Sequence, residues 1–196
     1  HVRAYYAHSN CEVVGICDFD EDKLGAQLKS VPGATTTTRA EELIGNSNID
    51  LISIASYDNF HFDQTITSIK AGQHVFVEKP LCLFRKDAIA IRECLASNEN
   101  VQLSSNLNLR SCPMFAELRS SVKSGELGRV FYLEGDYLWG RIHKLTEGWR
   151  REMPFYSIVH GAAVHLIDLL MWLTDSQPFE VQGFGNQIAT EHAGTE

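Results

Sequence analysis

His74-Val75-Phe76-Val77-Glu78-Lys79-Pro80 is the stretch that decides how this sequence folds. Its first four residues form an apolar run with the length of a buried strand, and a charged pair and a proline end that run. A residue before proline is held extended, so no helix begins on Lys79 and its side chain leaves the end of the strand. Ligands of open parallel sheets bind just outside such strand ends. Glu78, Lys79 and Pro80 are therefore candidate site residues, although a solvated lysine beside a turn proline explains the motif alone.

The residues on both sides of this strand alternate between short apolar runs and helical patterns. Strands are expected at 12–18, 50–55, 73–77 and 101–104, with a weaker β-rich run at 35–38, and helices at 1–8, 20–30, 40–44, 60–71 and 86–98. Short apolar strands separated by helices are typical of βαβ units. We therefore predict an α/β fold with a Rossmann-like, doubly wound parallel sheet over residues 1–107.

The pattern changes from residue 108 onward. Helices are expected at 112–123 and 160–173, and strands at 130–139 and 179–188. The first of these strands alternates between apolar and polar residues, which is typical of antiparallel strands with one solvated face. Two strands alone are marginal in water. We therefore predict that residues 108–196 form part of an α+β substrate domain with an open, mainly antiparallel sheet.

The composition is that of a globular protein with an acidic surface. The 196 residues carry a net charge of −8 without a basic cluster, which argues against nucleic acid and anionic membranes as partners. No apolar stretch is long enough to span a bilayer. The five cysteines are scattered and odd in number, so we expect reduced thiols and a cytoplasmic protein. The chain begins with His1 rather than Met, and we expect it to be a fragment, which leaves a signal peptide undecided.

Asp18 ends the first apolar strand, where a dinucleotide-binding fold places an acid that hydrogen-bonds the ribose hydroxyls of NAD. Its carboxylate would repel the 2′-phosphate of NADP, and no Arg or Lys follows at positions 19 and 20. The sequence thus favours NAD, with NADP less favoured. The alternative is that Asp18 only caps the turn. A Gly-rich phosphate loop is expected before His1, because residues 1–8 have the pattern of the helix that such a loop opens.

The polar segment 56–61 closes the next strand and starts a helix. The pyrophosphate or the nicotinamide ribose passes such a strand end in dinucleotide-binding folds. We therefore expect Ser56 and His61 to contact the cofactor. The alternative for His61 is a place in the first helical turn without such contact.

His165 and Asp168 are three residues apart in the helix expected at 160–173 and share one face. A histidine with a nearby carboxylate suits proton transfer near neutral pH. A core histidine bonded within its own domain is the alternative. His160 lies five residues before His165 and does not share its face, so a metal site is not expected. No G-x-S-x-G motif is present for an acyl hydrolase.

Together these residues resemble the Gfo/Idh/MocA (glucose-fructose oxidoreductase / inositol dehydrogenase) family. The resemblance rests on Glu78-Lys79-Pro80 after a βαβ strand, Arg110 after the final strand, and G-x-x-x-H-x-x-D at 161–168. It implies a Rossmann domain that binds a nicotinamide cofactor and a second domain with a large open sheet. It also implies a sugar, polyol or related substrate, and a homo-oligomer built through the C-terminal sheet.

The resemblance also implies roles for single residues. Lys79 corresponds to the catalytic or substrate-positioning lysine and His165 to the proton-transfer histidine. Asp168 and Arg110 are expected near the substrate. The departure is Gly161, where members of the family often carry an aspartate, and His160 is the neighbour that would replace it in part.

The expected reaction is reversible hydride transfer between a nicotinamide cofactor and a substrate CH–OH group. Two alternatives stay open. The bound NAD serves as an internal redox shuttle in a glycosidase or epimerase, or the protein is a non-catalytic sensor or partner subunit with the same fold. The chain by itself is expected to be inactive.

Overall fold

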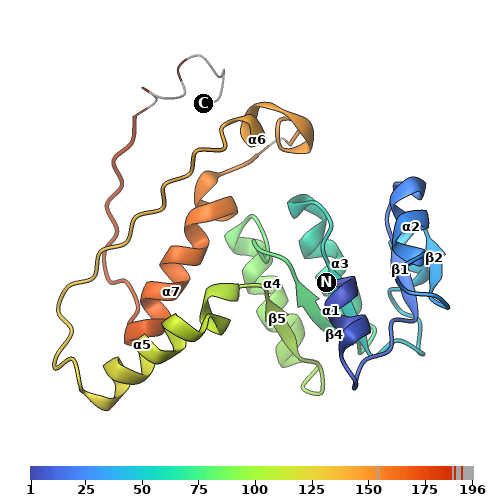
Figure 1. The fold of residues 1–196 in the computed structure, drawn as a ribbon, viewed down its shortest axis with the longest axis horizontal. Coiled ribbons are helices and arrows are strands. Elements are labelled where there is room, and N and C mark those ends of the chain that lie inside the picture. Colours follow the sequence, from blue (N-terminus) through green and yellow to red (C-terminus); the bar gives the residue numbers. More distant parts are fainter. Residues whose placement is uncertain (154, 187, 189–190, 192–196) are drawn as a thin grey trace. The chain divides into compact units, whose positions relative to one another are not determined.

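A computed structural model describes residues 1–153, 155–186, 188 and 191 of the chain (Figure 1). The chain divides into two compact units, His1–Asn106 (unit 1) and Leu107–Glu196 (unit 2). Among the described residues, no helix combines the length and the apolar character of a membrane span. The same residues contain no cluster of three or more His, Cys, Asp or Glu side chains suited to hold a metal ion.

Unit 1 is a parallel α/β structure, as the sequence predicts. Its strands are β1 (Gly15–Cys17), β2 (Thr35–Thr37), β3 (Leu51–Ile54), β4 (His74–Val77) and β5 (Leu103–Ser105). β1 pairs in parallel with β2, and β3, β4 and β5 form a second parallel sheet in that order. The difference from the expected single sheet lies between β1 and β3, which no ladder joins in the described part of the chain. β4 is the central strand of the larger sheet, which explains its continuous apolar sequence.

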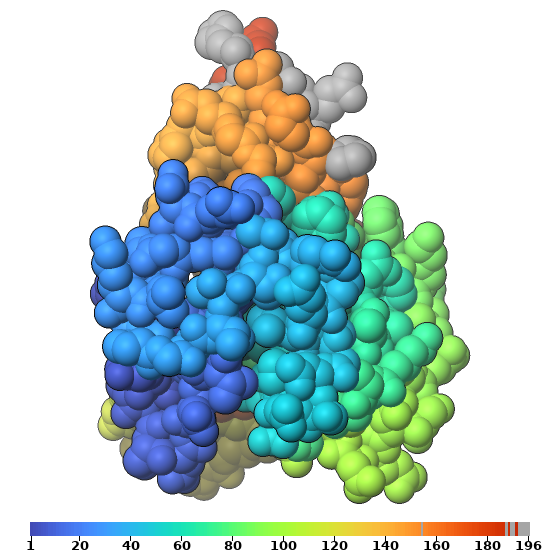
Figure 2. Space-filling view, turned by 90° about the vertical axis from the view of Figure 1, so that its right-hand side faces the viewer, coloured from blue at the N-terminus to red at the C-terminus, as the bar shows by residue number. Residues whose placement is uncertain are grey.

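The helices of unit 1 are α1 (Val2–Ala7), α2 (Glu21–Leu28), α3 (His61–Lys70) and α4 (Arg85–Ala96), with 3₁₀ turns η1 (Ala40–Glu42) and η2 (Asp58–Phe60). Asp20 caps α2, because its carboxylate accepts hydrogen bonds from the backbone N–H groups of Asp22 and Lys23. The helix expected at 40–44 is only the 3₁₀ turn η1. The segment from α1 to η1 forms the dark- to light-blue part of the surface in Figure 2.

Two apolar clusters make up the core of unit 1. The larger cluster lies on β3, β4, α3, α4 and the segment before β5, and consists of Ile54, Ile69, Val75, Val77, Ile91 and Val101. The smaller cluster lies around β1 and α2 and consists of Ile16, Leu24, Val31 and Ala34. The larger cluster holds the carboxyl ends of β3 and β4 on a rigid base, and most of the candidate site residues of unit 1 follow these two strands.

Unit 2 contains η3 (Asn108–Ser111), α5 (Pro113–Ser124), α6 (His143–Thr146), η4 (Gly148–Arg150), the π-helical turn η5 (Val159–Ala163) and α7 (Val164–Thr174). α5 begins at a proline, which suits the first turn of a helix, and ends at Gly125 with a φ of 77°. α5 and α7 pack together, and the Arg119 guanidinium of α5 lies 4.5 Å from the ring centroid of Trp172 on α7.

The two strands predicted in unit 2 are not formed. Residues 130–139 are irregular, and so are the described residues of 179–188, of which residue 187 lies outside the description. A strand needs a neighbour that accepts and donates its backbone hydrogen bonds, and no described segment of unit 2 supplies one. The segment 130–139 instead contacts α7 at Gly135, where an added Cβ atom would come within 2.6 Å of Leu166.

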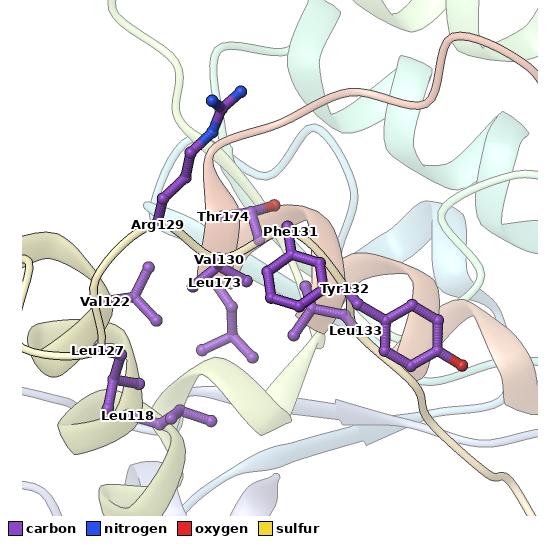
Figure 3. A pocket seen from close by; sticks show the side chains of 10 residues that line it. All are labelled: Leu118, Val122, Leu127, Arg129, Val130, Phe131, Tyr132, Leu133, Leu173 and Thr174. Atoms are coloured by element: carbon purple, nitrogen blue, oxygen red, sulfur yellow. The ribbon is translucent and has the colours of Figure 1, made fainter.

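The start of this irregular segment closes an apolar hollow within unit 2 (Figure 3). Its lining comes from α5, from the residues after Gly125 and from the end of α7, and consists of Leu118, Val122, Leu127, Arg129, Val130, Phe131, Tyr132, Leu133, Leu173 and Thr174. Phe131 is 94% exposed. The alternating apolar residues that predict a strand thus leave large apolar side chains at the surface of unit 2.

Candidate functional site

The loop after β4 carries Glu78, whose carboxylate contacts His1, Lys79 and Asn106. Its Oε1 accepts a hydrogen bond from the Asn106 side-chain amide at 2.7 Å and lies 2.9 Å from Nε2 of His1. Its Oε2 accepts from the backbone N–H of Lys79 at 3.2 Å. The structure therefore places Glu78, expected near the cofactor, where it ties the end of β4 to the end of β5.

Lys79 and Pro80 follow at the carboxyl end of the central strand, as the sequence predicts. Lys79 is partly exposed and Pro80 is buried, and the peptide bond between them is cis. The Pro80 carbonyl oxygen lies 2.7 Å from Nδ1 of His61. Lys79 therefore stands between two residues whose polar groups are bonded within unit 1.

His61 and Ser56 lie at the end of β3 and the start of α3. The His61 ring is fully buried, and its Nε2 lies 3.1 Å from the Ser56 carbonyl oxygen. The Ser56 hydroxyl donates a hydrogen bond to Oε1 of Gln64 at 2.7 Å. This placement favours the alternative for His61, a place in the first helical turn with its ring turned into the unit.

Asp18 follows β1 and is half-buried. Its Oδ1 accepts a hydrogen bond from the backbone N–H of Asp20 at 3.0 Å. Burial raises the pKa of the neighbouring Cys17 thiol, and the negative charges of Asp18, Glu41 and Glu42 raise it further. The end of β1 is thus an acidic environment, in which the Asp18 carboxylate can accept hydrogen bonds.

Arg110 and Asp168 meet in unit 2. Nε of Arg110, in η3, donates to Oδ2 of Asp168, in α7, at 2.8 Å, and a second guanidinium N–H donates to Oδ1. The hydrogen bond that Arg110 donates to Asp168 raises the pKa of the guanidinium. The Asp168 side chain is only 11% exposed. Two residues predicted near the substrate therefore form a bidentate ion pair that joins η3 to α7.

Replacing Arg110 with methionine is expected to lower the stability of unit 2 by about 1–3 kcal/mol, because a mostly buried carboxylate loses its partner. Urea unfolding of the full-length protein, followed by tryptophan fluorescence, measures this loss. Asp168→Asn removes the buried charge, so Arg110→Met should cost clearly less in that background. Equal losses in both backgrounds would contradict the assigned pair.

Gly161 lies in η5, and the space where a side chain at this position would lie is occupied by Tyr156. An added Cβ atom at Gly161 would come within 2.0 Å of the Tyr156 hydroxyl oxygen. Nε of Arg150 donates to that hydroxyl at 3.2 Å, and the Tyr156 ring contacts Trp149 edge-on. Where the resemblance expects an aspartate, this chain holds a phenol hydroxyl beside a guanidinium.

Gly161→Ala is expected to destabilise unit 2 by about 1–3 kcal/mol, because the new methyl group forces Tyr156 away from Arg150. Thermal unfolding measures the effect. Gly140→Ala is the matched control, since nothing lies within 4 Å of its added Cβ. A Tyr156→Ala background should remove the cost at Gly161, and an unchanged cost there would contradict this explanation.

The two predicted histidines of unit 2 lie before and on α7. His160 is in η5, half-buried, with its ring 5.8 Å from the ring of Phe155. His165 is half-buried in the first turn of α7, one turn before Asp168. The carboxylate expected to assist His165 is therefore engaged by Arg110.

Sequence reasoning missed Asn106, Tyr156 and Arg150. Asn106 directly follows β5, so the rule that polar residues at the ends of parallel strands build sites would have found it. The sequence carries no signal for Tyr156, because its contact with Gly161 depends on the π-helical turn.

Comparison with known families gives two matches. A profile described as an oxidoreductase family with an NAD-binding Rossmann fold matches residues 1–106, and a profile described as a GFO/IDH/MocA C-terminal domain matches residues 115–196.

Individual relatives agree with these matches. A 1,5-anhydro-D-fructose reductase from Ensifer adhaerens is 27% identical over 94% of this chain and 56% of its own length. An inositol 2-dehydrogenase from Saccharopolyspora erythraea is 25% identical over 100% of this chain and 53% of its own. The chain thus spans about half the length of the curated relatives it matches.

Solved structures show the same fold. The myo-inositol 2-dehydrogenase of Lactobacillus plantarum has a TM-score of 0.86, with 26% identity over 98% of this chain and 57% of its own. A scyllo-inositol dehydrogenase from Lactobacillus casei, solved with NAD(H) and scyllo-inositol, has a TM-score of 0.75 at 17% identity, covering 89% of this chain and 52% of its own. At that identity the likeness shows the fold alone.

Proposed function

Because this chain belongs to the Gfo/Idh/MocA oxidoreductase family, we propose that the whole protein is an NAD-dependent oxidoreductase that acts on a CH–OH group of a sugar, polyol or related substrate. The observation that carries the proposal is the loop Glu78-Lys79-Pro80 at the carboxyl end of the central parallel strand β4. In this fold that edge of the sheet is where a dinucleotide and its substrate bind.

The residues at the strand ends fit NAD. Asp18 has one carboxylate oxygen bonded to the backbone of Asp20, and its other oxygen suits the ribose hydroxyls. Its acidic surroundings favour NAD over NADP. Ser56 and the Glu78-Lys79-Pro80 loop would line the path of the cofactor along the same edge. When bound, NAD supplies the redox chemistry, because its nicotinamide ring accepts a hydride from the substrate carbon.

Lys79 and His165 are the proposed catalytic residues. Lys79 donates a hydrogen bond to the reacting oxygen of the substrate and stabilises the negative charge that develops on it. His165 takes the proton from the same hydroxyl in the oxidative direction and returns it in the reverse direction.

Polyols and related sugars are the favoured substrates, because relatives that match 94% and 100% of this chain are named for 1,5-anhydro-D-fructose and inositol. His160 and the Arg110–Asp168 pair are proposed to contact the substrate. The outer side of the pair remains accessible, since the Arg110 side chain is 46% exposed, and guanidinium and carboxylate groups both bind hydroxyls.

The test uses the full-length protein. Titration calorimetry with NAD and with NADP measures the cofactor preference, and turnover is followed as NADH formed from myo-inositol and scyllo-inositol, or consumed with 1,5-anhydro-D-fructose. The proposal expects tighter binding of NAD and net change in NADH with at least one substrate. Substrate conversion without net NADH change would instead indicate an internal redox shuttle, and NAD binding without any turnover would indicate a sensor.

A homo-oligomer built through unit 2 is also proposed. The supporting observation is the set of large apolar side chains exposed on its irregular segments, which includes Phe131, Leu138, Phe179, Val181 and Phe184. Such a set usually marks a surface that another chain covers. Sedimentation velocity of the full-length protein is expected to show an oligomer, and a monomer would overturn this part of the proposal.

A further inference from the structure

Two carbonyl groups from neighbouring strand ends meet at one buried ring in unit 1. β3 and β4 are paired in parallel, and the chain leaves them through Ser56 and through Glu78-Lys79-Pro80. His61, the first residue of α3, lies with Nδ1 2.7 Å from the Pro80 carbonyl oxygen and Nε2 3.1 Å from that of Ser56. Its ring has no exposed surface. The ring therefore joins the two loops that follow β3 and β4.

We propose that His61 is a positioning residue that holds the loop of Lys79 in place through the carbonyl of Pro80. The inference rests on the proposed function for its consequence in catalysis, and on the two contacts of the ring for its structural part. It replaces direct cofactor contact, expected from the sequence for His61, with an action through the backbone beside Lys79.

The helix α3, which carries His61, is held firmly in unit 1. α3 carries Thr65 and Ile69, both with 0% exposure, on the same side as His61, so the helix is anchored in the core of unit 1. A buried side chain on an anchored helix has little freedom to move. The ring therefore transmits a fixed position from α3 to Pro80.

Lys79 is held in the loop by hydrogen bonds of the residues before and after it. Before it, Glu78 donates its backbone N–H to the Ile54 carbonyl and accepts a hydrogen bond from Asn106. After it, Pro80 contacts His61 through its carbonyl. Proline has no N–H to donate, so the carbonyl is its one backbone group that a hydrogen bond can hold. Removing the donor would leave a buried carbonyl unsatisfied and free the loop on one side.

Two substitutions separate the two contacts of the ring. An asparagine amide nitrogen takes the place of Nδ1, so His61→Asn retains the donor to Pro80. A glutamine amide nitrogen takes the place of Nε2, so His61→Gln keeps a polar group beside the Ser56 carbonyl and places no donor at Pro80. Amide hydrogen exchange of residues 78–83 in the full-length protein measures how often the loop opens.

We expect amide exchange about 10-fold faster in His61→Gln, because the loss of one buried hydrogen bond has an effect of this size. Exchange in His61→Asn should stay within about twofold of that in the unaltered protein. Equal exchange in both variants would overturn the inference. The unaltered protein gives a second test that needs no substitution. Its ¹⁵N-histidine spectrum should show a protonated Nδ1 at His61, and an unprotonated Nδ1 would also overturn the inference.

Turnover tests the consequence in catalysis separately. With myo-inositol and NAD, His61→Gln should lower kcat about 10-fold with an unchanged Kd for NAD, and His61→Asn should restore most of it. In a Lys79→Met background, His61→Gln should cause no further loss, because its effect passes through Lys79. A further loss there would overturn the positioning role. If Lys79→Met itself left turnover unchanged, the proposed function of Lys79 would fail, and loop exchange would still decide the role of His61 in holding the loop.

Discussion

Replacing Lys79 with methionine is expected to lower kcat of the full-length protein by about 10²–10³-fold. The methionine keeps the length of the side chain and removes its charge and its donors, so the reacting oxygen loses its stabilising partner. The loop should keep its position, because the contacts of Glu78 with Asn106 and of Pro80 with His61 do not involve the lysine amine. Steady-state turnover of a polyol with NAD measures the change.

Lys70→Met is the matched control. Lys70 is exposed at the end of α3, and its substitution removes the same charge from the same unit. It should leave kcat unchanged. The melting temperature and the Kd for NAD should stay close to those of the unaltered protein in both variants. Full activity of Lys79→Met would end the assignment of this lysine to the reaction.

Replacing His165 with alanine is expected to lower kcat by about 10²–10⁴-fold near neutral pH, because no other group of α7 then takes the substrate proton. Small amine bases such as imidazole should restore part of the rate if a proton acceptor is what was lost. Turnover with and without added imidazole measures both effects.

His143→Ala is the control for this variant, since His143 is exposed on α6 in the same unit. It should keep full activity and show no response to imidazole. A His165→Ala protein that turns over normally, or one whose lost rate follows only a lower melting temperature, would remove His165 from the mechanism.

The sequence predicts the parallel part of the fold well, for a physical reason. Buried parallel strands need continuous apolar runs, and His74–Val77 is such a run in the centre of its sheet. Asp20 marks the start of α2 because its carboxylate caps the helix, and Gly72 marks the end of α3 because its φ of 79° suits a residue without a side chain. These signals are local, so one sequence suffices to read them.

The strands predicted in unit 2 fail because their signal is not local. The alternation of apolar and polar residues over 130–139 is typical of a strand with one apolar and one polar face. A strand forms only where a second strand supplies its hydrogen bonds. Phe131 and Leu138, both 94% exposed, show that the apolar face is present without such a partner among the described residues. Pattern alone could not indicate which segment would cover it.

The candidate site was predictable where the chain itself positions a residue. Lys79 lies at the end of β4 because a strand and a proline place it there. The ion pair between Arg110 and Asp168 joins residues far apart in sequence, and only the packing of η3 against α7 brings them together. The burial of His61 likewise depends on how α3 packs. The position of His61 in the sequence therefore could not decide between contact with the cofactor and a place in the first helical turn.

The proposed hydride transfer can be followed through one deuterium atom. The full-length protein is incubated with NAD and with myo-inositol or scyllo-inositol deuterated at its ring carbons, and the NADH that forms is analysed by mass spectrometry. We expect NADH that carries one deuterium from the substrate, formed by the unaltered protein and strongly reduced in Lys79→Met. A folded, NAD-binding protein that transfers no deuterium to the cofactor from either polyol would contradict the proposed polyol oxidoreductase.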